Sequence, residues 1–403
     1  MRRERRGRLL TGISGNVLVL GLVSLLNDAS SEMIYPIMPL FLSAIGATGV
    51  LIGLIEGAAE TTASLLKVVS GWYSDRFQRR KAFITAGYGL SALSKPLLCL
   101  ASSAYDVLGI RIAERVGKGV RSAPRDALIA DSTPRESWGK AFGFHKAMDS
   151  TGAVIGPILI LPVLLAASTV TTGTYRLIFL LAAIPVLVAV LVIVLLVKET
   201  RGRGPQERKP FLAGMTRLGW GFWVSMAVVA VFYLGEVSYA FFILQAQAAS
   251  LDDVSIILLY ILFNVVFVLT AIPSGVLSDR YGRRPVLSAS FLLFGATCAV
   301  MAVADATWLL AAGFSLLGLY KGSSEGVFKA YVSDVCPKEV RGTGLGTFHT
   351  CVGLVMLPGG VIAGALWDSV GHWAPFAFGG AMAVISVALL HLVGRARPNP
   401  ADR

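Results

Sequence analysis

Long apolar runs alternate with short polar segments along the whole chain. A helix needs about 20 apolar residues to cross a bilayer, and these runs lack the two-residue alternation of barrel strands. We expect twelve spans, near 16–44, 49–72, 83–101, 107–128, 141–166, 176–197, 218–245, 254–277, 286–304, 307–331, 343–368 and 373–394. The pattern therefore predicts an all-α integral membrane protein with twelve transmembrane helices.

The polar segments repeat. "SGWYSDRFQRRK", from Ser70, returns 204 positions later as "SGVLSDRYGRRP", from Ser274, each time after the second span of a half. The segments that begin at Asp131 and Asp334 also match at nearly the same offset. Internal repeats of this kind build alternating-access transporters, with the substrate site at the repeat interface. We therefore expect two pseudo-symmetric six-helix bundles, residues 1–200 and 216–403, joined by a cytoplasmic linker at 201–215.

Composition and charge support a membrane protein with both ends inside the cell. Hydrophobic residues make up 55% of the chain, charged residues 15%, and the formal net charge is +12. Most basic residues fall in the segments that would face the cytoplasm, whereas the outside loops hold only Arg176. The positive-inside rule then predicts cytoplasmic termini in the inner or plasma membrane. The net charge reflects topology, so we expect no nucleic-acid partner.

Other function classes find little support in the sequence. The four cysteines, Cys99, Cys298, Cys336 and Cys351, are scattered without a C-x-x-C pair, so we expect neither a disulfide framework nor a metal site. A phosphate-binding loop is absent, as is a visible nucleophile and base pair, so we expect no cofactor and no enzyme. A channel would need a continuous pore, which the duplicated loops argue against.

Charges inside apolar spans mark the candidate solute and proton site, because a charge at the bilayer centre persists mainly where it faces a cavity or a partner. Asp28, Glu60 and Arg115 are expected at similar depth, so an acid beside a base could exchange a proton for solute. The alternative is a neutralised structural network. The full candidate set is Asp28, Glu32, Glu56, Glu60, Lys95, Arg115, Lys118, Glu236, Asn264, Lys321 and Glu325. Both signs of charge favour a polar, zwitterionic or anionic solute.

Two histidines occupy equivalent places near the inner ends of the fifth and eleventh spans. His145 and His349 could form a gating contact or sense pH. We expect inherited packing instead.

The repeated loop resembles the first loop motif of the major facilitator superfamily, G-x-x-x-D-R-x-G-R-R-[KR]. The first copy replaces the inner glycine by Gln78, and the second ends in Pro285. In that family the cluster latches the outward-open state, which implies a gating role for both copies. The matching residues are Gly71, Asp75, Arg76, Arg79, Arg80, Gly275, Asp279, Arg280, Arg283 and Arg284.

Two further motifs are similar to those of the family. Arg115, Lys118 and Gly119 resemble R-x-x-Q-G, whose arginine is associated with proton coupling. Gly152, Gly156 and Pro157 resemble the antiporter motif G-x-x-x-G-P, although Ile160 and Leu161 replace the glycine pair that should follow. Close helix packing is the alternative meaning of these glycines.

The resemblance implies a bacterial efflux-type secondary transporter whose partners are a small solute, protons and the lipid bilayer. We expect a monomer, as is common in the family. Export is the first hypothesis, and proton-coupled uptake of a charged metabolite or metal chelate is the second.

Overall fold

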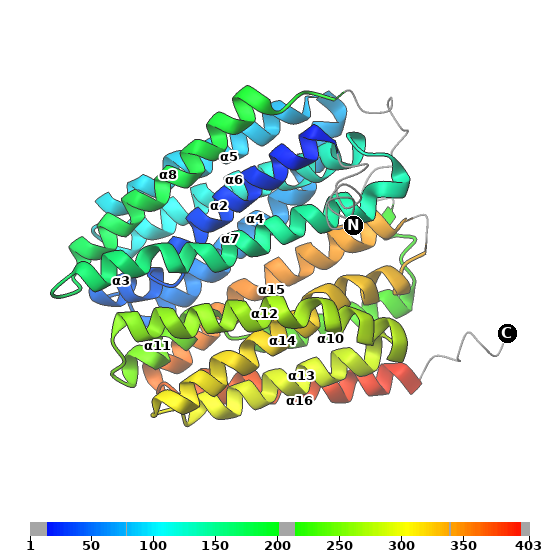
Figure 1. Cartoon of the computed structure of the whole chain (residues 1–403). Coiled ribbons are helices and arrows are strands. Elements are labelled where there is room, and N and C mark those ends of the chain that lie inside the picture. Colours follow the sequence, from blue (N-terminus) through cyan, green and yellow to red (C-terminus); the bar gives the residue numbers. More distant parts are fainter. Residues whose placement is uncertain (1–13, 78, 201–213, 338–339, 396–403) are drawn as a thin grey trace, which may run out of the picture. The chain divides into compact units, whose positions relative to one another are not determined.

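The computed structural model describes residues 14–77, 79–200, 214–337 and 340–395, without the side chains of 71, 72, 75–77 and 393–395. Within these ranges the chain is helical and contains no strand (Figure 1). Ten helical segments are long and apolar enough to cross a membrane. Two more, α6 (Ala104–Asp131) and α14 (Thr307–Val335), have sufficient length but are less apolar. The prediction of an all-α fold with twelve spans is confirmed.

Contacts between helices define a first unit, which holds the described residues of Met1–Tyr35 and Leu65–Arg208. In this unit α2 packs against α7 and α8, and α5 packs against α6 and α8. Val17, Ile84, Leu128 and Ile193 belong to its buried apolar core. Besides α6, its elements are α2 (Gly15–Ile34), the second part of α4 (Gly49–Phe77), α5 (Arg80–Leu97), η1 (Leu98–Leu100), η2 (Arg135–Ser137), α7 (Trp138–Ala166) and α8 (Thr172–Leu196).

The second unit holds Pro36–Ser64 and the described residues of Lys209–Arg403. Its core is rich in aromatic rings; for example, Phe232 stacks on Phe291 with ring centroids 4.1 Å apart. The expected linker 201–215 lies outside the described residues except for its last two. Besides α14, the elements are α3 (Met38–Ala44), the first part of α4, α10 (Trp220–Gly235), α11 (Tyr239–Ala248), α12 (Asp253–Tyr281), α13 (Arg283–Ala302), α15 (Arg341–Ser369) and α16 (Ala374–Arg395).

Within the second unit, α4 and α15 approach so closely that glycines are required at the contact. A Cβ atom on Gly57 would lie 2.7 Å from Leu357 Cα, and Gly53 abuts the backbone of Gly360. Asp368 of α15 accepts hydrogen bonds from the N–H groups of Gly49 (2.8 Å) and Val50 (2.9 Å). A carboxylate at a helix N-terminus is stabilising because it accepts orphan N–H groups. We call this contact the α4–α15 seam: Gly49, Gly53, Gly57, Leu357, Gly360, Gly364 and Asp368.

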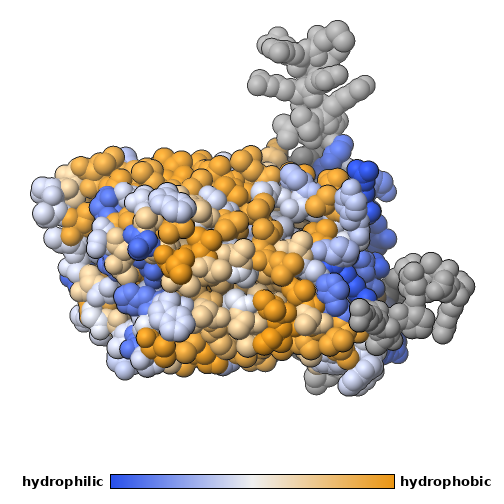
Figure 2. Space-filling view, turned by 90° about the horizontal axis from the view of Figure 1, so that it is seen from below, coloured by the Kyte–Doolittle hydropathy of each residue, from blue (hydrophilic) through white to orange (hydrophobic). Residues whose placement is uncertain are grey.

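The helices expose apolar side chains of the kind that a bilayer would cover. Five residues of α8, each about half exposed, follow a helical spacing of three or four and therefore lie on one face of the helix. They are Leu177, Leu180, Ile184, Leu187 and Leu191. Figure 2 shows apolar residues over much of one face of the molecule. Such a surface fits contact with lipid tails.

Candidate functional site

The first span of each half is broken, which the sequence reasoning did not predict. α2 ends at Ile34 and α3 begins at Met38, with Pro36 between them. Proline has no N–H group, so a helix is easily interrupted there. α10 likewise ends at Gly235 and α11 begins at Tyr239. Broken spans often carry the solute and ion sites of transporters.

The two breaks carry the same residue pair. Glu32 and Tyr35 stand 204 positions before Glu236 and Tyr239, so a Glu-x-x-Tyr sequence recurs at each break. The offset equals that of the repeated loop motif, which makes these positions equivalent in the two halves.

In the second unit, Glu236 is the centre of a hydrogen-bonded group. Its Oε1 atom accepts a hydrogen bond from the Tyr320 hydroxyl and another from Lys321 Nζ, both at 2.5 Å. Glu236 is buried at the C-terminal end of α10, so pairing with Lys321 offsets the cost of removing its charge from water. The charges of Glu60 and Glu325 also act on Lys321. We call Glu60, Glu236, Tyr320, Lys321 and Glu325 the Glu236 cluster.

Three candidates of the second unit, including Glu325 of the cluster, have local partners. Glu56 accepts a hydrogen bond from the Tyr239 hydroxyl at 3.2 Å, beside the break in the span. Asn264 is buried and donates to the carbonyl of Tyr260, one turn earlier in α12. Glu325 pairs with Lys329 at 3.2 Å on an exposed face of α14.

In the first unit, arginines of α6 gather at the end of α2. Arg111 is fully buried and pairs with Glu114 at 2.6 Å. The guanidinium groups of Arg111 and Arg115 lie 5.1 and 5.3 Å from the centre of the Tyr35 ring. A desolvated cation over an aromatic ring contributes about 2 kcal/mol. The aromatic residue at the break therefore meets two cations at once.

Two further cations extend this group along α5 and α6. Lys95 is buried and donates to Ser30 Oγ (2.7 Å) and Ser31 Oγ (3.0 Å) of α2. Arg121 donates to Ser91 Oγ (2.6 Å) and Asn27 Oδ1 (3.2 Å) and lies 4.4 Å from the Tyr88 ring centre. We call Lys95, Arg111, Glu114, Arg115 and Arg121 the α6 cluster.

Asp28 and Glu32 lie on the face of α2 that meets α7. A Cβ atom on Gly152 would lie 3.1 Å from Asp28 Cβ, and one on Gly156 would lie 2.7 Å from Glu32 Cβ. Asp28 accepts a hydrogen bond from Asn27 at 2.9 Å, and the charge of Lys118 acts on it. Both glycines of the antiporter-like motif thus allow close contact between α2 and α7, and Pro157 is buried beside them.

The first copy of the loop motif is only partly described. Gly71, Asp75 and Arg76 lie outside the residues whose side chains the structure describes, and Arg79 is exposed. Arg80 pairs with Asp131, at the end of α6, at 2.9 Å.

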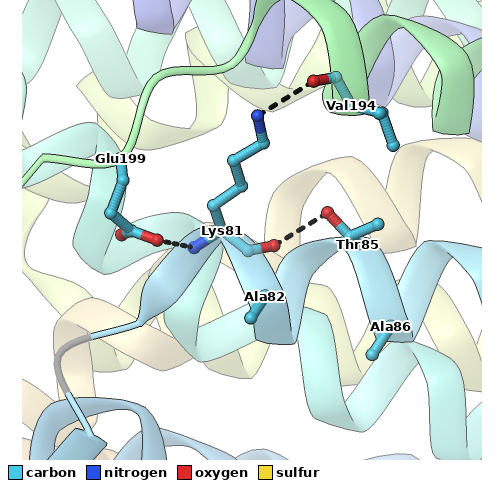
Figure 3. Close-up of a pocket in the computed structure, with 6 residues that line it drawn as sticks. All are labelled: Lys81, Ala82, Thr85, Ala86, Val194 and Glu199. Atoms are coloured by element: carbon cyan, nitrogen blue, oxygen red, sulfur yellow. Dashed lines mark hydrogen bonds between the residues drawn. The ribbon is translucent and has the colours of Figure 1, made fainter.

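Glu199 holds the beginning of α5 beside this motif. Its carboxylate accepts the N–H group of Arg80 at 3.0 Å. As Figure 3 shows, it also accepts the N–H group of Lys81, at 3.0 Å, and Lys81 Nζ donates to the carbonyl of Val194. Lys81, Val194 and Glu199, with Ala82, Thr85 and Ala86, line an open pocket of about 590 Å³ between the start of α5 and the end of α8. The motif thereby ties three helices of the first unit together.

The second copy makes a comparable tie. Arg283 pairs with Asp279 and, at 3.3 Å, with Asp334 near the end of α14. Gly282 has a φ of +93°, a conformation that residues with a side chain rarely adopt, so the inner glycine is needed here. Gly275 borders open space, while Arg280 is exposed and Arg284 is half-buried.

The sequence reasoning missed three members of the site. Arg111 was overlooked, although it stands one turn before Arg115 on α6. Tyr35 was not considered because its neighbours read as a continuous apolar span. Asp149 of α7, which acts on Asp28, was also missed; it lies one turn before Gly152.

Comparisons with known proteins identify the family. The model of the Major Facilitator Superfamily matches residues 20–252 and 225–403. An uncharacterized MFS-type transporter of Methanocaldococcus jannaschii is 37% identical over 385 residues, covering 94% of both chains. A class C tetracycline resistance protein of Escherichia coli is 42% identical over 104 residues, a quarter of each chain. A mutant of the nucleoside transporter NupG has a similar structure, with a TM-score of 0.78 and 12% identity over 94% of this chain and 99% of that one. The chain belongs to the Major Facilitator Superfamily and is a multi-pass membrane transporter of a small-molecule solute rather than an enzyme.

Proposed function

We propose that the chain couples protons to the export of a small polar or charged solute by alternating access. The observation that carries this proposal is the burial of paired charges beside the break of each first span. Charges inside the bilayer are costly and usually mark ion and solute pathways. A network that served packing alone would have no need to lie at two equivalent helix breaks.

The charges of the described residues indicate the class of solute. The α6 cluster holds four cations and one acid, whereas the Glu236 cluster with Glu56 holds more acids than bases. A carboxylate, sulfonate or phosphate group of the solute would suit the arginines, which bind such groups through two parallel N–H donors. An ammonium group would suit the acids of the second unit. A zwitterionic or anionic solute therefore fits both clusters better than a lipophilic one does.

Alternating access would come from rocking of residues 1–200 against 216–403 in the cell membrane, with both termini in the cytoplasm and the protein acting as a monomer. The α4–α15 seam joins residues from both of these segments. We propose that it closes the outer side and opens during the cycle. The two loop motifs would hold the alternative state at the inner side, with Arg80 and Arg283 as the tied residues.

Two observations bear on the direction of transport. Gly152, Gly156 and Pro157 resemble the antiporter motif, and the name of one relative assigns it tetracycline resistance. Both favour export. Uptake of a charged metabolite or metal chelate would use the same clusters and is the alternative.

Growth assays test the proposal directly. Cells overproducing the protein would be compared with cells making Arg115→Ala, across toxic amino acids, organic acids, antibiotics, chelates and metal salts. Lys140→Ala, an exposed change, is the matched control. Export predicts selective protection that Arg115→Ala removes and Lys140→Ala keeps. Selective sensitisation would establish uptake instead, and equal growth of all strains on every compound would contradict the proposal.

A further inference from the structure

A group of titratable side chains outside the α6 cluster lies along α7. His145 is only 4% exposed, and its Nδ1 atom lies 3.8 Å from Asp149 Oδ1. His145 Nε2 and Asp149 Oδ1 are both buried, and neither has a hydrogen-bond partner in the described part of the chain. Buried polar atoms are normally hydrogen-bonded, so each such exception calls for an explanation. A site that binds a proton or an ordered water would provide one.

Close packing brings Asp28 of α2 to the same place. A Cβ atom on Gly152 would lie 2.5 Å from the Leu25 carbonyl oxygen and 3.1 Å from Asp28 Cβ. Asp149 precedes Gly152 by three residues and therefore lies on the same side of α7. The charge of Asp149 acts on Asp28, in agreement with this packing.

The three residues form a series in depth. At 1.5 Å per residue, His145 lies ~10 Å and Asp149 ~16 Å from the start of α7 at Trp138. Asp28 lies ~20 Å from the start of α2 at Gly15, the level that Gly152 reaches on α7. Both helix starts are expected on the cytoplasmic side. The series therefore leads from near the inner surface toward the middle of the bilayer.

Charged groups on the neighbouring helices surround the series. From α6, Arg125 and Asp126 act on His145, and Arg125 and Lys118 act on Asp28. Lys146 is the neighbour on α7 itself. Arg125 is bonded to Asp126 at 2.9 Å and to Ser24 Oγ at 3.4 Å. In α8, the charged residue within Thr172–Leu196 is Arg176. It lies near the start of that helix, at the end far from His145.

We propose that Asp28, Asp149 and His145 form one proton-binding site, with His145 at its cytoplasmic side. The inference rests on the proton coupling proposed above and adds two residues to it. Two neighbouring carboxylates repel each other, so a single proton shared between them stabilises the pair. The proton arrives from water, forms one O–H or N–H bond in the site and returns to water when that bond breaks. His145 is then part of the site, in place of the packing role expected from sequence.

Infrared spectroscopy of the purified protein in liposomes tests the site with protons as the only probe. Lowering the bath from about pH 8 to about pH 5 should produce the band of a protonated carboxyl group in the wild type. Asp149→Asn and Asp28→Asn should each reduce this band by roughly half or more, because they remove one half of the shared pair. Asp149→Glu should keep it, which separates loss of the carboxylate from misfolding. His145→Gln should move the midpoint of its appearance by about one pH unit.

A matched variant and the growth assay separate the possible failures. Asp126→Asn removes a neighbouring carboxylate that is hydrogen-bonded to Arg125 and does not belong to the proposed site. The carboxyl band should therefore persist in this variant. Equal bands in the wild type, Asp28→Asn and Asp149→Asn would overturn the proton site, even if the growth assay showed export. Loss of the band in those two variants with no solute effect in growth would uphold the site and contradict the transport proposal.

Discussion

The α6 cluster and the Glu236 cluster are built around the corresponding fourth spans of the two halves, α6 and α14, yet they differ in the sign of their net charge. Both lie beside a broken first span with the Glu-x-x-Tyr pair. Lys321 of the Glu236 cluster also has a counterpart on the fourth span of the first half, Lys118, at an offset of 203 positions. Asp131 and Asp334 share this offset. At the same offset Phe314 stands where the first half has Arg111, and Gly318 where it has Arg115.

The comparison separates what duplication kept from what one half acquired. The helix break, the glutamate, the tyrosine and the lysine recur, as expected for parts that any alternating-access cycle of this chain would use. The arginines do not recur. Since an arginine pair inside a membrane-spanning helix is costly, we infer that it serves the proposed zwitterionic or anionic solute rather than the cycle.

Arg111→Met should have the largest effect and would show how far the α6 cluster depends on pairing. Glu114, whose side chain is 7% exposed, would lose its 2.6 Å partner. Removing one member of a buried ion pair costs about 3–5 kcal/mol. Thermal unfolding in detergent should reveal this loss. Lys321→Met should cost less, because that side chain is 37% exposed and Tyr320 still donates to Glu236.

The double variant Arg111→Met with Glu114→Met provides the check on this explanation. Replacing both members of a buried pair by apolar residues is often nearly neutral, so stability should largely return. A double variant as unstable as Arg111→Met alone would show that the 2.6 Å pair is not the cause.

Glu236→Gln should have the next largest effect, on transport rather than on folding. Glutamine keeps an acceptor for Tyr320 but loses the charge that holds Lys321. A hydrogen bond to a charged group contributes roughly 1.5–3 kcal/mol, so transport should fall about tenfold or more. Protection in the growth assay measures it, with Asp305→Asn, an exposed loop carboxylate, as the control. Full activity of Glu236→Gln would mean that the Glu236 cluster is structural and that the two clusters do not share a task.

Periodicity and repeat spacing predicted the class of fold because apolar run length is a strong signal in a membrane protein. The buried charges Asp28, Arg115 and Glu236 were found for the same reason, since each interrupts an apolar run. The break at Glu236 was not predictable in this way, because "LGEVSYA" contains no proline and its apolar pattern continues. Pairings such as Lys95 with Ser30 depend on how α5 packs on α2, which spacing along one helix does not determine.

Gly152→Ala should have a smaller effect, on stability. It compares how closely helices pack at equivalent positions of the two halves. The position 204 residues later is Met356, so the close approach at Gly152 belongs to the first half. The added Cβ would lie 2.5 Å from the Leu25 carbonyl oxygen and force α2 and α7 apart. Overpacking costs about 1–3 kcal/mol, partly offset by about 1 kcal/mol from the better helix propensity of alanine.

Gly143→Ala is the matched control, because it lies on the same helix and borders open space. Its melting temperature should stay level or rise, while that of Gly152→Ala falls. Equal behaviour of the two variants would mean that α2 and α7 can separate without cost, and that Gly152 does not hold Asp28 in place.

Asp368→Ala should have the smallest effect. It tests how two equivalent helix starts, those of α4 and α12, are capped. Positions 48 and 252 correspond at the offset of 204. Asp252 caps its own helix α12 by accepting from Ser255 N–H at 3.2 Å, and hydrogen bonds from Ser255 hold the pKa of Asp252 below its usual range. The start of α4 also has a local cap, since Thr48 Oγ1 accepts from Leu51 N–H at 3.3 Å, and Asp368 of α15 adds a second cap from another helix. Losing a capping side chain costs about 1 kcal/mol in either case, but only Asp368 also joins two helices.

A reporter cysteine at Ile52, which is 2% exposed, would distinguish the two caps in a background without the native cysteines. About 1 kcal/mol corresponds to a roughly fivefold shift in a two-state equilibrium, so Asp368→Ala should speed labelling by a membrane-impermeant maleimide about fivefold. Asp252→Ala should leave the labelling rate unchanged, because its cap lies within α12. Faster labelling in both variants would reflect general loosening, and unchanged labelling in both would show that the α4–α15 seam does not close the outer side.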